Sequence, residues 1–400
     1  MKILFVSSEF PLNKNEATGG IGTYLLNITE GLTNLGHEVI VLTTRKEKKA
    51  DYRNIRLIYV NWGEKFIKTA RKILSFSFFQ RFLNFLEYPL FFNFGSFLKI
   101  EKIVKKEKID IIEGNDFGGE LFFYLLLRRK GPPVVLVLHT PSFVIQKYNN
   151  EPNNLFYRIM KFLEVFCLKK ADSLYSPSKS LAKIISKEIK RPVKTIIPHP
   201  FKPLYNFSNI KRKNNLILYV GKLQAKKGVF LLIEAIPRIL KKFPKTLFYF
   251  AGPDTLQNGV SVKSLMIKRI KELGIFKSVI FLGNLPKKDL YKLYRLATAI
   301  VIPSLWENLG FVCFEAMSQG VSVIASKVGG FKEIFKNKET GLLFCPVNQN
   351  ELAKSVISLL RNPNLRRKIS HQAMTLVKQK YDQKSLIKKK FNYFNRLIKK

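Results

Sequence analysis

Residues 299–317 read Ala-Ile-Val-Ile-Pro-Ser-Leu-Trp-Glu-Asn-Leu-Gly-Phe-Val-Cys-Phe-Glu-Ala-Met, and they predict a single strand–loop–helix unit. The apolar run 299–302 is expected to be a buried strand, and the apolar run 311–317 a helix. A loop that leaves the carboxyl end of such a strand and opens a helix has free backbone N–H groups, so it can bind an anion. Gly310 would allow the backbone to come close to that ligand.

Two acidic residues, Glu307 and Glu315, flank the helix start. They are eight residues apart, which is about two turns at 3.6 residues per turn. One carboxylate can therefore contact one part of a ligand and the second another part, with a phosphate between them. This spacing suits a nucleoside diphosphate joined to a sugar. Such pairs also arise by chance in a chain with 28 acidic residues. Whether this pair is functional therefore depends on the residues around it.

Apolar strand patterns alternate with helical patterns along the whole chain. In the first half, strands are expected at 3–7, 38–43, 55–60, 109–113, 134–139, 173–176 and 195–198. In the second half they are expected at 216–220, 246–251, 279–283, 299–302, 321–325 and 342–345. This alternation predicts an α/β protein with two doubly wound parallel sheets, that is, two Rossmann-like domains facing each other across an interdomain cleft.

The domain boundaries follow from composition. Residues 204–214 are polar and basic without a period and predict a linker between an N-terminal domain, 1–203, and a C-terminal domain, 215–380. The tail, 381–400, alternates basic and apolar residues, which predicts an amphipathic helix.

The net charge of +42 favours anionic partners, namely nucleic acid, anionic lipid headgroups or phosphorylated substrates. No zinc-knuckle, aromatic RNA-binding or helix-turn-helix pattern accompanies the charge, so we expect no nucleic-acid partner. A lysine bias of the whole chain explains the charge equally well. The cysteines Cys167, Cys313 and Cys345 have neither metal-ligand nor disulfide spacing, and the N-terminus has no signal peptide, so a cytoplasmic location is expected.

Residues 73–100 are rich in Phe and Leu but are interrupted by polar residues such as Gln80 and Arg81, so they do not predict a membrane-spanning helix. An interfacial helix at an anionic membrane surface is one interpretation, with the protein peripheral at the inner face of the cell membrane. Two core-facing helices are the other. Both remain open.

The motif Pro-Ser…Glu-Asn-Leu-Gly…Glu-Ala-Met…Gly around Glu307 and Glu315 resembles the signature of retaining GT-B glycosyltransferases, the family 4-like enzymes also called glycosyl transferases group 1. The resemblance covers nearly the whole chain and is strongest over 216–345. In that family the last helices cross back onto the N-terminal domain, so the resemblance implies that the C-terminal helix, 381–400, packs there. It implies that Glu307 contacts the donor hexose and Glu315 the ribose. The backbone of Asn308, Leu309 and Gly310 would then bind the diphosphate.

Other candidate residues lie where ligands bind in open parallel sheets, outside the carboxyl ends of the strands. Gly19 and Gly20 precede a helical pattern at 24–35 and match the family's Gly-Gly loop, which faces diphosphate and acceptor. His139 ends a strand and resembles the family histidine near the donor sugar. Asn115 and Asp116 also follow a strand and are candidates for acceptor contacts.

Lysines follow the first strand of the second half. The sequence from 220 to 228 joins that strand to a helix expected at 229–240, and cations beside a helix start bind a diphosphate well. The family pattern is Gly-Arg-Leu…Lys-Gly, so Lys227 matches and Lys222 replaces an arginine. A lysine offers a point charge where arginine offers a planar fork, so a weaker phosphate contact is expected at Lys222. Leu285 would lie near the base.

Taken together, the resemblance implies a hexosyltransferase that moves a hexose, with retention, from a UDP- or GDP-linked donor to a hydroxyl of a glycan or lipid-linked glycan. No Asp-x-Asp motif or histidine cluster in the sequence suggests a metal, and the lysines can take its place, so no metal and no cofactor other than the donor is expected. His139, Lys227 and Glu307 would be catalytic. Two alternatives stay open: a nucleotide-sugar 2-epimerase of the same fold, and a non-catalytic nucleotide-sugar-binding membrane partner.

Overall fold

The structure is a computed structural model that describes residues 1–11, 19–44, 54–60, 92–149, 153–202, 213–257 and 259–399. The chain forms two compact units. The N-terminal unit comprises Met1–Pro200 together with Gln383–Lys400, and the C-terminal unit comprises Phe201–Asp382. Each unit has its own sheet, and the two are described in turn.

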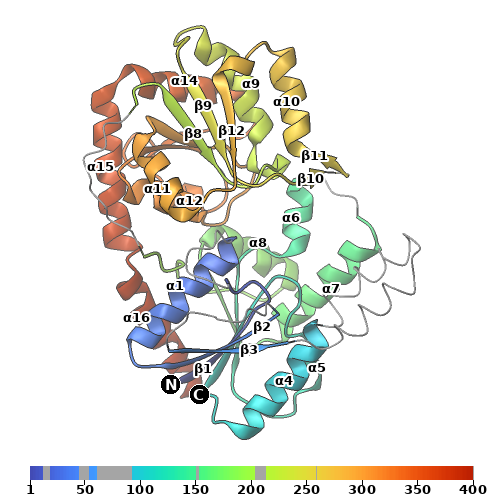
Figure 1. Cartoon of the computed structure of the whole chain (residues 1–400). Coiled ribbons are helices and arrows are strands. Elements are labelled where there is room, and N and C mark those ends of the chain that lie inside the picture. Colours follow the sequence, from blue (N-terminus) through green and yellow to red (C-terminus); the bar gives the residue numbers. More distant parts are fainter. Residues whose placement is uncertain are drawn as a thin grey trace. The chain divides into compact units, whose positions relative to one another are not determined.

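The N-terminal unit contains a parallel sheet in the order β3-β2-β1-β4-β5-β6-β7, covered by helices (Figure 1). Its elements are β1 (Lys2–Val6), α1 (Gly20–Asn34), β2 (Glu38–Thr43), β3 (Ile55–Tyr59), α4 (Asn93–Lys106), β4 (Ile111–Asn115), α5 (Phe122–Leu127), β5 (Val134–Val137), α6 (Ser142–Asn149), α7 (Leu155–Lys170), β6 (Ser173–Ser176), α8 (Lys179–Ile189), β7 (Thr195–Ile196) and α16 (Gln383–Ile398). The central strands are buried on both faces, which is why they are continuous apolar runs in the sequence.

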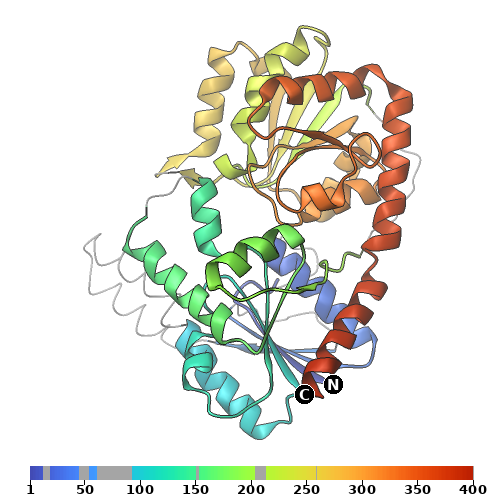
Figure 2. The same ribbon diagram turned by 180° about the vertical axis from the view of Figure 1, so that it is seen from behind.

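The last helix, α16, belongs to the N-terminal unit, where it lies beside α1 in both views (Figures 1 and 2). Gly31 of α1 allows this close approach, because a Cβ at that position would lie 2.0 Å from Cδ1 of Ile387. At one end of α16 the Gln383 amide donates to the carbonyl of Asn27 (2.7 Å). The chain therefore completes its first unit with its last helix.

The C-terminal unit contains a second parallel sheet, in the order β12-β9-β8-β13-β14-β15. Its elements are β8 (Leu216–Val220), a 3₁₀ turn (Ala225–Lys227), α9 (Val229–Leu240), β9 (Leu247–Ala251), the hairpin β10 (Leu256–Gln257) and β11 (Val260–Ser261), α10 (Val262–Glu272), a second 3₁₀ turn (Phe276–Ser278), β12 (Val279–Gly283), α11 (Lys287–Leu296), β13 (Ala299–Ile302), α12 (Phe311–Ser318), β14 (Ser322–Ser326), α13 (Phe331–Ile334), β15 (Leu342–Phe344), α14 (Gln349–Arg361) and α15 (Pro363–Lys380). An apolar core of aliphatic and aromatic side chains lies between this sheet and helices α9, α10 and α14.

The predicted fold class, two Rossmann-like parallel-sheet α/β domains, is confirmed. Most expected strands are within a residue or two of the observed bounds. The largest difference at a candidate site concerns α1, which begins at Gly20 and not at residue 24. The glycines lower helix propensity, so the apolar pattern indicated a later start. Strand β4 runs to Asn115, two residues beyond its expected end, because its register with β1 and β5 continues.

Two predictions fall on parts of the chain that lie outside the described residues. These are most of the expected linker, at 204–212, and most of the aromatic stretch, at 73–91. The remainder of that stretch, 92–100, enters α4, which packs within the N-terminal unit. Among the helices that the structure describes, none is long and apolar enough to cross a membrane.

Candidate active site

Two βα loops of the C-terminal unit meet through their backbones. Gly228, with φ +71°, starts α9, and a Cβ on it would lie 1.8 Å from the carbonyl oxygen of Pro303 at the end of β13. Next to this contact the Leu305 N–H donates to the carbonyl of Lys226 (2.7 Å). Only a residue without a side chain fits here, so Gly228 fixes the distance between the loop after β8 and the loop after β13.

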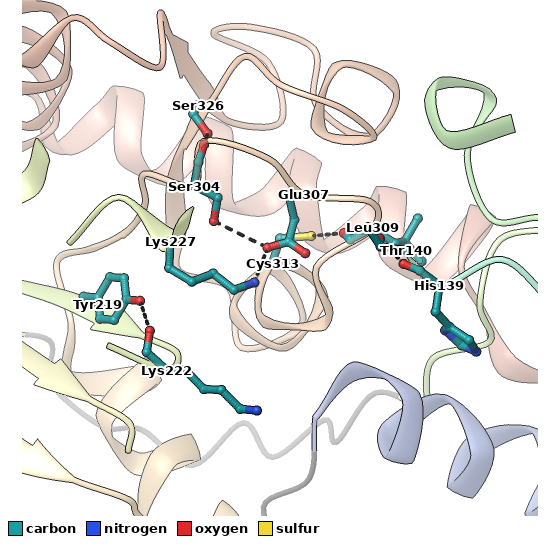
Figure 3. Close-up of polar contacts among 10 residues, drawn as sticks. All are labelled: His139, Thr140, Tyr219, Lys222, Lys227, Ser304, Glu307, Leu309, Cys313 and Ser326. Carbon is teal, nitrogen blue, oxygen red and sulfur yellow. Dashed lines mark hydrogen bonds and ion pairs between the residues drawn. The ribbon is translucent and has the colours of Figure 1, made fainter. Parts of the chain in front are cut away.

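This backbone contact places Lys227 against Glu307. The Lys227 ammonium lies 2.6 Å from Oε2 of Glu307, and the Ser304 hydroxyl is 3.4 Å from the same oxygen (Figure 3). The two charged side chains are 28% and 15% exposed. Water therefore reaches the pair but does not surround it, so the attraction is screened less than at an open surface. The result is an oriented cation beside an oriented carboxylate.

The loop that carries Glu307 is held on its other side by a glycine pair. Gly329 has φ +41°, and a Cβ on it would lie 2.1 Å from the carbonyl oxygen of Glu307. The Gly330 N–H donates to that same oxygen (3.0 Å). The main chain at Glu307 is thus fixed from both sides, which limits the movement of its carboxylate.

Gly310 begins helix α12. It adopts a left-handed conformation (φ +65°), and no side chain caps the helix start. Asn308 and Leu309, just before it, are each 5% exposed. The loop Asn308–Gly310 is therefore a packed turn that leads into a helix N-terminus, the arrangement that suits an anion.

Glu315 lies one and a half turns into α12 and has a different environment from Glu307. Its Oε2 accepts a hydrogen bond from the hydroxyl of Tyr294 in α11 (2.8 Å). Tyr294 is fully buried. Desolvation raises the pKa of Glu315 above its usual range, although the tyrosine hydrogen bond and the charge of Lys287 oppose the shift. Among the described residues, no cation forms an ion pair with Glu315, which is thus an oriented hydrogen-bond acceptor, whereas Glu307 is ion-paired.

Lys222 and Leu285 follow two strands of the same sheet, β8 and β12, which are separated by β9. Lys222 follows β8 and has an exposed side chain, while its carbonyl accepts a hydrogen bond from Tyr219 (2.8 Å). Leu285 follows β12 and is half-buried. Between them the backbone passes closely at Gly252, where a Cβ would lie 2.0 Å from the carbonyl oxygen of Gly221. The carboxyl edge of this sheet is therefore shaped by glycines.

In the N-terminal unit, the backbone at His139 is held by Asp116. Oδ1 of Asp116 accepts hydrogen bonds from the N–H groups of His139 (2.8 Å) and Thr140 (3.4 Å). Thr140 has φ +150°, which is a strained conformation for a residue with a side chain. Burial raises the pKa of Asp116 well above its usual range. The Asp116 carboxyl thus stabilises the strained turn at His139 and Thr140.

The ring of His139 packs against two other rings. It meets Tyr24 of α1 edge-on at 4.9 Å and the ring of His199 at 4.7 Å. Burial lowers the pKa of His139 to about 3, so the imidazole is neutral near pH 7. A neutral imidazole can donate from one nitrogen and accept at the other, which suits contacts with sugar hydroxyls.

Gly19 and Gly20 form the N-terminus of α1. Gly19 is the cap residue with no side-chain capping bond, and its carbonyl accepts from the Thr23 N–H (3.0 Å). Both glycines are exposed, and a Cβ on Gly20 would meet nothing within 4 Å. The helix start therefore presents its backbone openly.

Two expectations from the sequence need correction. Asn115 and Asp116, expected to touch an acceptor, are only 3% and 1% exposed. The Asn115 amide donates to the hydroxyl of Ser7 (2.8 Å) and to Glu120 (3.3 Å), and Asp116 serves the His139 turn. Both side chains are buried because β4 extends to Asn115 in the middle of the sheet.

Sequence reasoning also missed Glu164, a buried residue of α7. Its carboxyl accepts from the N–H of Gly118 (3.0 Å) and from both the N–H and the hydroxyl of Ser142 (2.9 and 2.8 Å). Burial raises its pKa to about 7, in spite of these hydrogen bonds. Glu164 thus joins the loop after β4 to the start of α6, close in sequence to His139. The only signal in the sequence is one acid within an apolar helical run.

The structure brings Lys227, Glu307 and the loop Asn308–Gly310 together in one corner of the C-terminal unit. Lys222, Leu285 and Glu315 lie at strand ends and helix starts of that unit. His139, Gly19 and Gly20 lie at strand ends and helix starts of the N-terminal unit. Within the described part of the chain, no group of three or more His, Cys, Asp or Glu residues is arranged to hold a metal ion.

Comparisons with known proteins address the family and the fold of the chain. Residues 18–201 match the family model described as Glycosyltransferase Family 4, and residues 202–375 match Glycosyl transferases group 1. An uncharacterised glycosyltransferase of Methanocaldococcus jannaschii is 27% identical, covering 98% of each chain. Among solved structures, sucrose-phosphate synthase from Thermosynechococcus elongatus has a TM-score of 0.77 at 20% identity and covers 99% of this chain and 98% of its own. Anabaena HepE in complex with UDP-glucose has a TM-score of 0.70 at 18% identity, covering 99% and 100%.

The backbone contact at Gly228 can be tested by substitution. Gly228→Ala should destabilise the C-terminal unit more than Gly274→Ala, whose φ of +67° is similar but whose Cβ would meet nothing within 4 Å. The left-handed conformation costs both variants about 1–2 kcal/mol. Overpacking against Pro303 should add roughly another 1–3 kcal/mol in Gly228→Ala alone. Urea unfolding measures the difference, and equal losses in the two variants would show that the close approach does not exist.

The raised pKa of Glu164 predicts a dependence of stability on pH. The unfolded carboxyl loses its proton near pH 4.5 and the folded one near pH 7. Between these values the folded state binds more protons, so the free energy of unfolding falls as the pH rises. Glu164→Gln does not titrate, so wild type should lose on the order of 3 kcal/mol relative to this variant between pH 4.5 and 7.

Urea unfolding of both proteins across this pH range measures the effect. Glu101→Gln, at a glutamate of the same unit whose side chain is 32% exposed, is the matched control for the loss of one carboxylate outside the core. Parallel profiles for wild type and Glu164→Gln would mean that Glu164 titrates normally.

Proposed function

The chain belongs to the glycosyltransferases of the GT-B fold, which use nucleotide-sugar donors, and we propose that it transfers a hexose with retention to a hydroxyl of a glycan or lipid-linked glycan. The observation that carries this proposal is the ion pair between Lys227 and Glu307 beside the start of α12. It combines a cation for a diphosphate with a carboxylate for sugar hydroxyls in one corner of one domain.

Departure of the nucleotide leaving group builds negative charge on its diphosphate. In our proposal Lys227 and the backbone N–H groups of the loop Asn308–Gly310 stabilise this charge. Lys227 is already oriented by Glu307 and partly removed from water, so little reorganisation is needed when the charge develops. Lys222, with its exposed side chain, supplies a second cation.

The carboxylates have separate roles in this proposal. Glu307 accepts hydrogen bonds from the hydroxyls of the donor hexose and positions the sugar. It does not act as a nucleophile in this proposal. Glu315 accepts from the ribose hydroxyls, since the Tyr294 hydrogen bond orients its carboxylate and leaves the other oxygen for a ligand. Leu285 borders the base. The leaving phosphate takes the proton from the acceptor hydroxyl, and no metal is required.

In the N-terminal unit, His139 would contact the donor sugar as a neutral imidazole, and the open helix start at Gly19 and Gly20 would face phosphate and acceptor. A UDP-linked donor is supported by the UDP-glucose bound to Anabaena HepE. A GDP-linked donor is the alternative. The net charge of +42 supports an anionic acceptor environment, such as a lipid-linked glycan at the inner face of the membrane.

A nucleotide-sugar 2-epimerase and a non-catalytic binder of the same fold remain the competing functions. The three are separated by a panel of UDP- and GDP-sugars incubated with the protein, with and without glycan or lipid-linked acceptors. Transfer requires both donor and acceptor and gives a glycosidic product. An epimerase isomerises the donor alone, and a binder shifts the melting temperature with the nucleotide but turns over neither mixture.

The site itself is tested by two substitutions. Lys227→Ala and Glu307→Ala should each lower kcat by roughly 100- to 1,000-fold, because each removes a group that acts on the donor in the transition state. Lys242→Ala, at an exposed lysine just after α9, is the matched control and should keep wild-type activity. Circular dichroism verifies that each variant is folded. Full activity in either site variant would show that the site is misplaced.

A further inference from the structure

A lysine of the last helix is buried in the core of the N-terminal unit. Lys390 of α16 and Glu113 of β4 are each 1% exposed, and the Lys390 ammonium lies 2.8 and 2.7 Å from the two carboxylate oxygens of Glu113. Four aromatic rings surround the ammonium with centroids 4.6–5.6 Å away, those of Phe5, Tyr24, Tyr175 and Phe394. The proposed reaction uses neither Lys390 nor Glu113.

Stability alone does not account for this pair. Removing two charged groups from water costs several kcal/mol per ion, and well-packed apolar residues in their place are often equally stable or better. Burial raises the pKa of Glu113 well above its usual range and lowers the pKa of Lys390 well below its own. What the pair provides, and what apolar side chains do not, is a set of directed hydrogen bonds.

Those hydrogen bonds converge on one hydroxyl. The Tyr24 hydroxyl donates a hydrogen bond to Oε1 of Glu113 (2.5 Å) and accepts one from the Lys390 ammonium. It also lies 2.6 Å from the hydroxyl of Tyr175. The three protons of the ammonium therefore have three acceptors, namely two carboxylate oxygens and this hydroxyl. Tyr24 is held at its tip by three different parts of the unit, β4, β6 and α16.

The ring of Tyr24, held in this way at its hydroxyl, packs against the candidate site residue His139. It lies in the first turns of α1, four residues after Gly20, and its ring packs at 4.9 Å against His139 and at 4.5 Å against His199. A change in the tilt of Tyr24 therefore displaces the His139 imidazole and the start of α1. The backbone of His139 is held separately by Asp116, so Tyr24 acts on the ring.

We propose that Glu113 and Lys390 are positioning residues for the transfer reaction: their buried pair holds Tyr24, and Tyr24 sets the ring orientation of His139. This inference rests on the proposed function, in which His139 contacts the donor sugar. It also gives the C-terminal helix a part in the reaction, because α16 supplies the lysine. Neither residue touches substrate, and both act through Tyr24.

The chain's histidines make this testable without an activity assay. The sequence contains four, and they occupy distinct places. His139 and His199 contact Tyr24, and His37 stacks on Phe391 of α16 at 4.6 Å, next in sequence to Lys390. His371 belongs to the C-terminal unit. Ring signals of histidine labelled with ¹³C therefore report separately on the Tyr24 contact, on the docking of α16 and on the other unit.

The experiment compares wild type with the double variant Lys390→Met/Glu113→Gln, which removes both charges at nearly constant volume and leaves no buried ion. Tyr24→Phe is the second variant, since it keeps the ring and deletes only the hydroxyl. We expect both to fold, with the signals of His37 and His371 unchanged and that of His139 displaced. We expect kcat to fall on the order of 10- to 100-fold, the scale of a small misplacement of a contacting group. The affinity for the nucleoside diphosphate alone, measured by calorimetry with UDP and GDP, should fall by a smaller factor than kcat, because most of its proposed contacts (Lys222, Lys227, the loop Asn308–Gly310 and Glu315) lie in the other unit and only the helix start at Gly19 and Gly20 lies near Tyr24.

An unchanged kcat in the folded double variant overturns the proposal, whatever the spectrum shows. So does a displaced His37 signal, because the loss would then follow from undocking of α16. A double variant that cannot fold would show that the pair serves the core and not the site, which also overturns it. If wild type transfers no sugar with any donor and acceptor, the proposed function fails, while the His139 signal still decides whether the pair orients that ring.

Discussion

The interaction on which the candidate site depends is the ion pair between Lys227 and Glu307, two residues that are far apart in sequence. It forms because Gly228 lets the backbone before α9 contact the carbonyl of Pro303, so that two βα loops of one sheet pack directly against each other. An ammonium held 2.6 Å from one carboxylate and partly removed from water has given up much of its hydration before any ligand arrives. In the proposed function, the diphosphate of the donor would meet a cation that is already placed and oriented.

Several of the few acidic residues in this basic chain are buried and accept hydrogen bonds from loops. Of 28 Asp and Glu, several in the N-terminal unit are buried as internal anchors and not displayed at the surface. Glu120 accepts from the N–H and the hydroxyl of Ser8, Glu164 holds the start of α6, and Asp116 holds the His139 turn. Each ties together loops at the carboxyl edge of the sheet. One of these loops, the one after β5, carries His139.

The two glutamates of the motif are also distinguished by their surroundings. Both lie near the start of α12, yet one pairs with a lysine and the other with a buried tyrosine hydroxyl. The carboxylate of Glu307 is oriented by an ion pair, whereas that of Glu315, beside a tyrosine in a desolvated position, offers a directed acceptor. This difference in environment, more than their spacing, supports separate roles for Glu307 and Glu315.

The sequence by itself determined the two parallel sheets, the enzyme class and the corner formed by residues 303–315. These depend on local signals: apolar strands buried on both faces, glycines at turns that only glycine can adopt, and a motif contained in one βα unit. It did not determine that α1 starts at Gly20, that Asn115 and Asp116 are buried, or that Glu164 and Lys390 are internal anchors. Those properties arise from contacts between segments tens to hundreds of residues apart, such as β4 with α16. A lone charged residue in an amphipathic helix looks the same whether it faces water or a partner in the core. Only the packing of the folded chain, which removes water from one side of that helix, decides which it is.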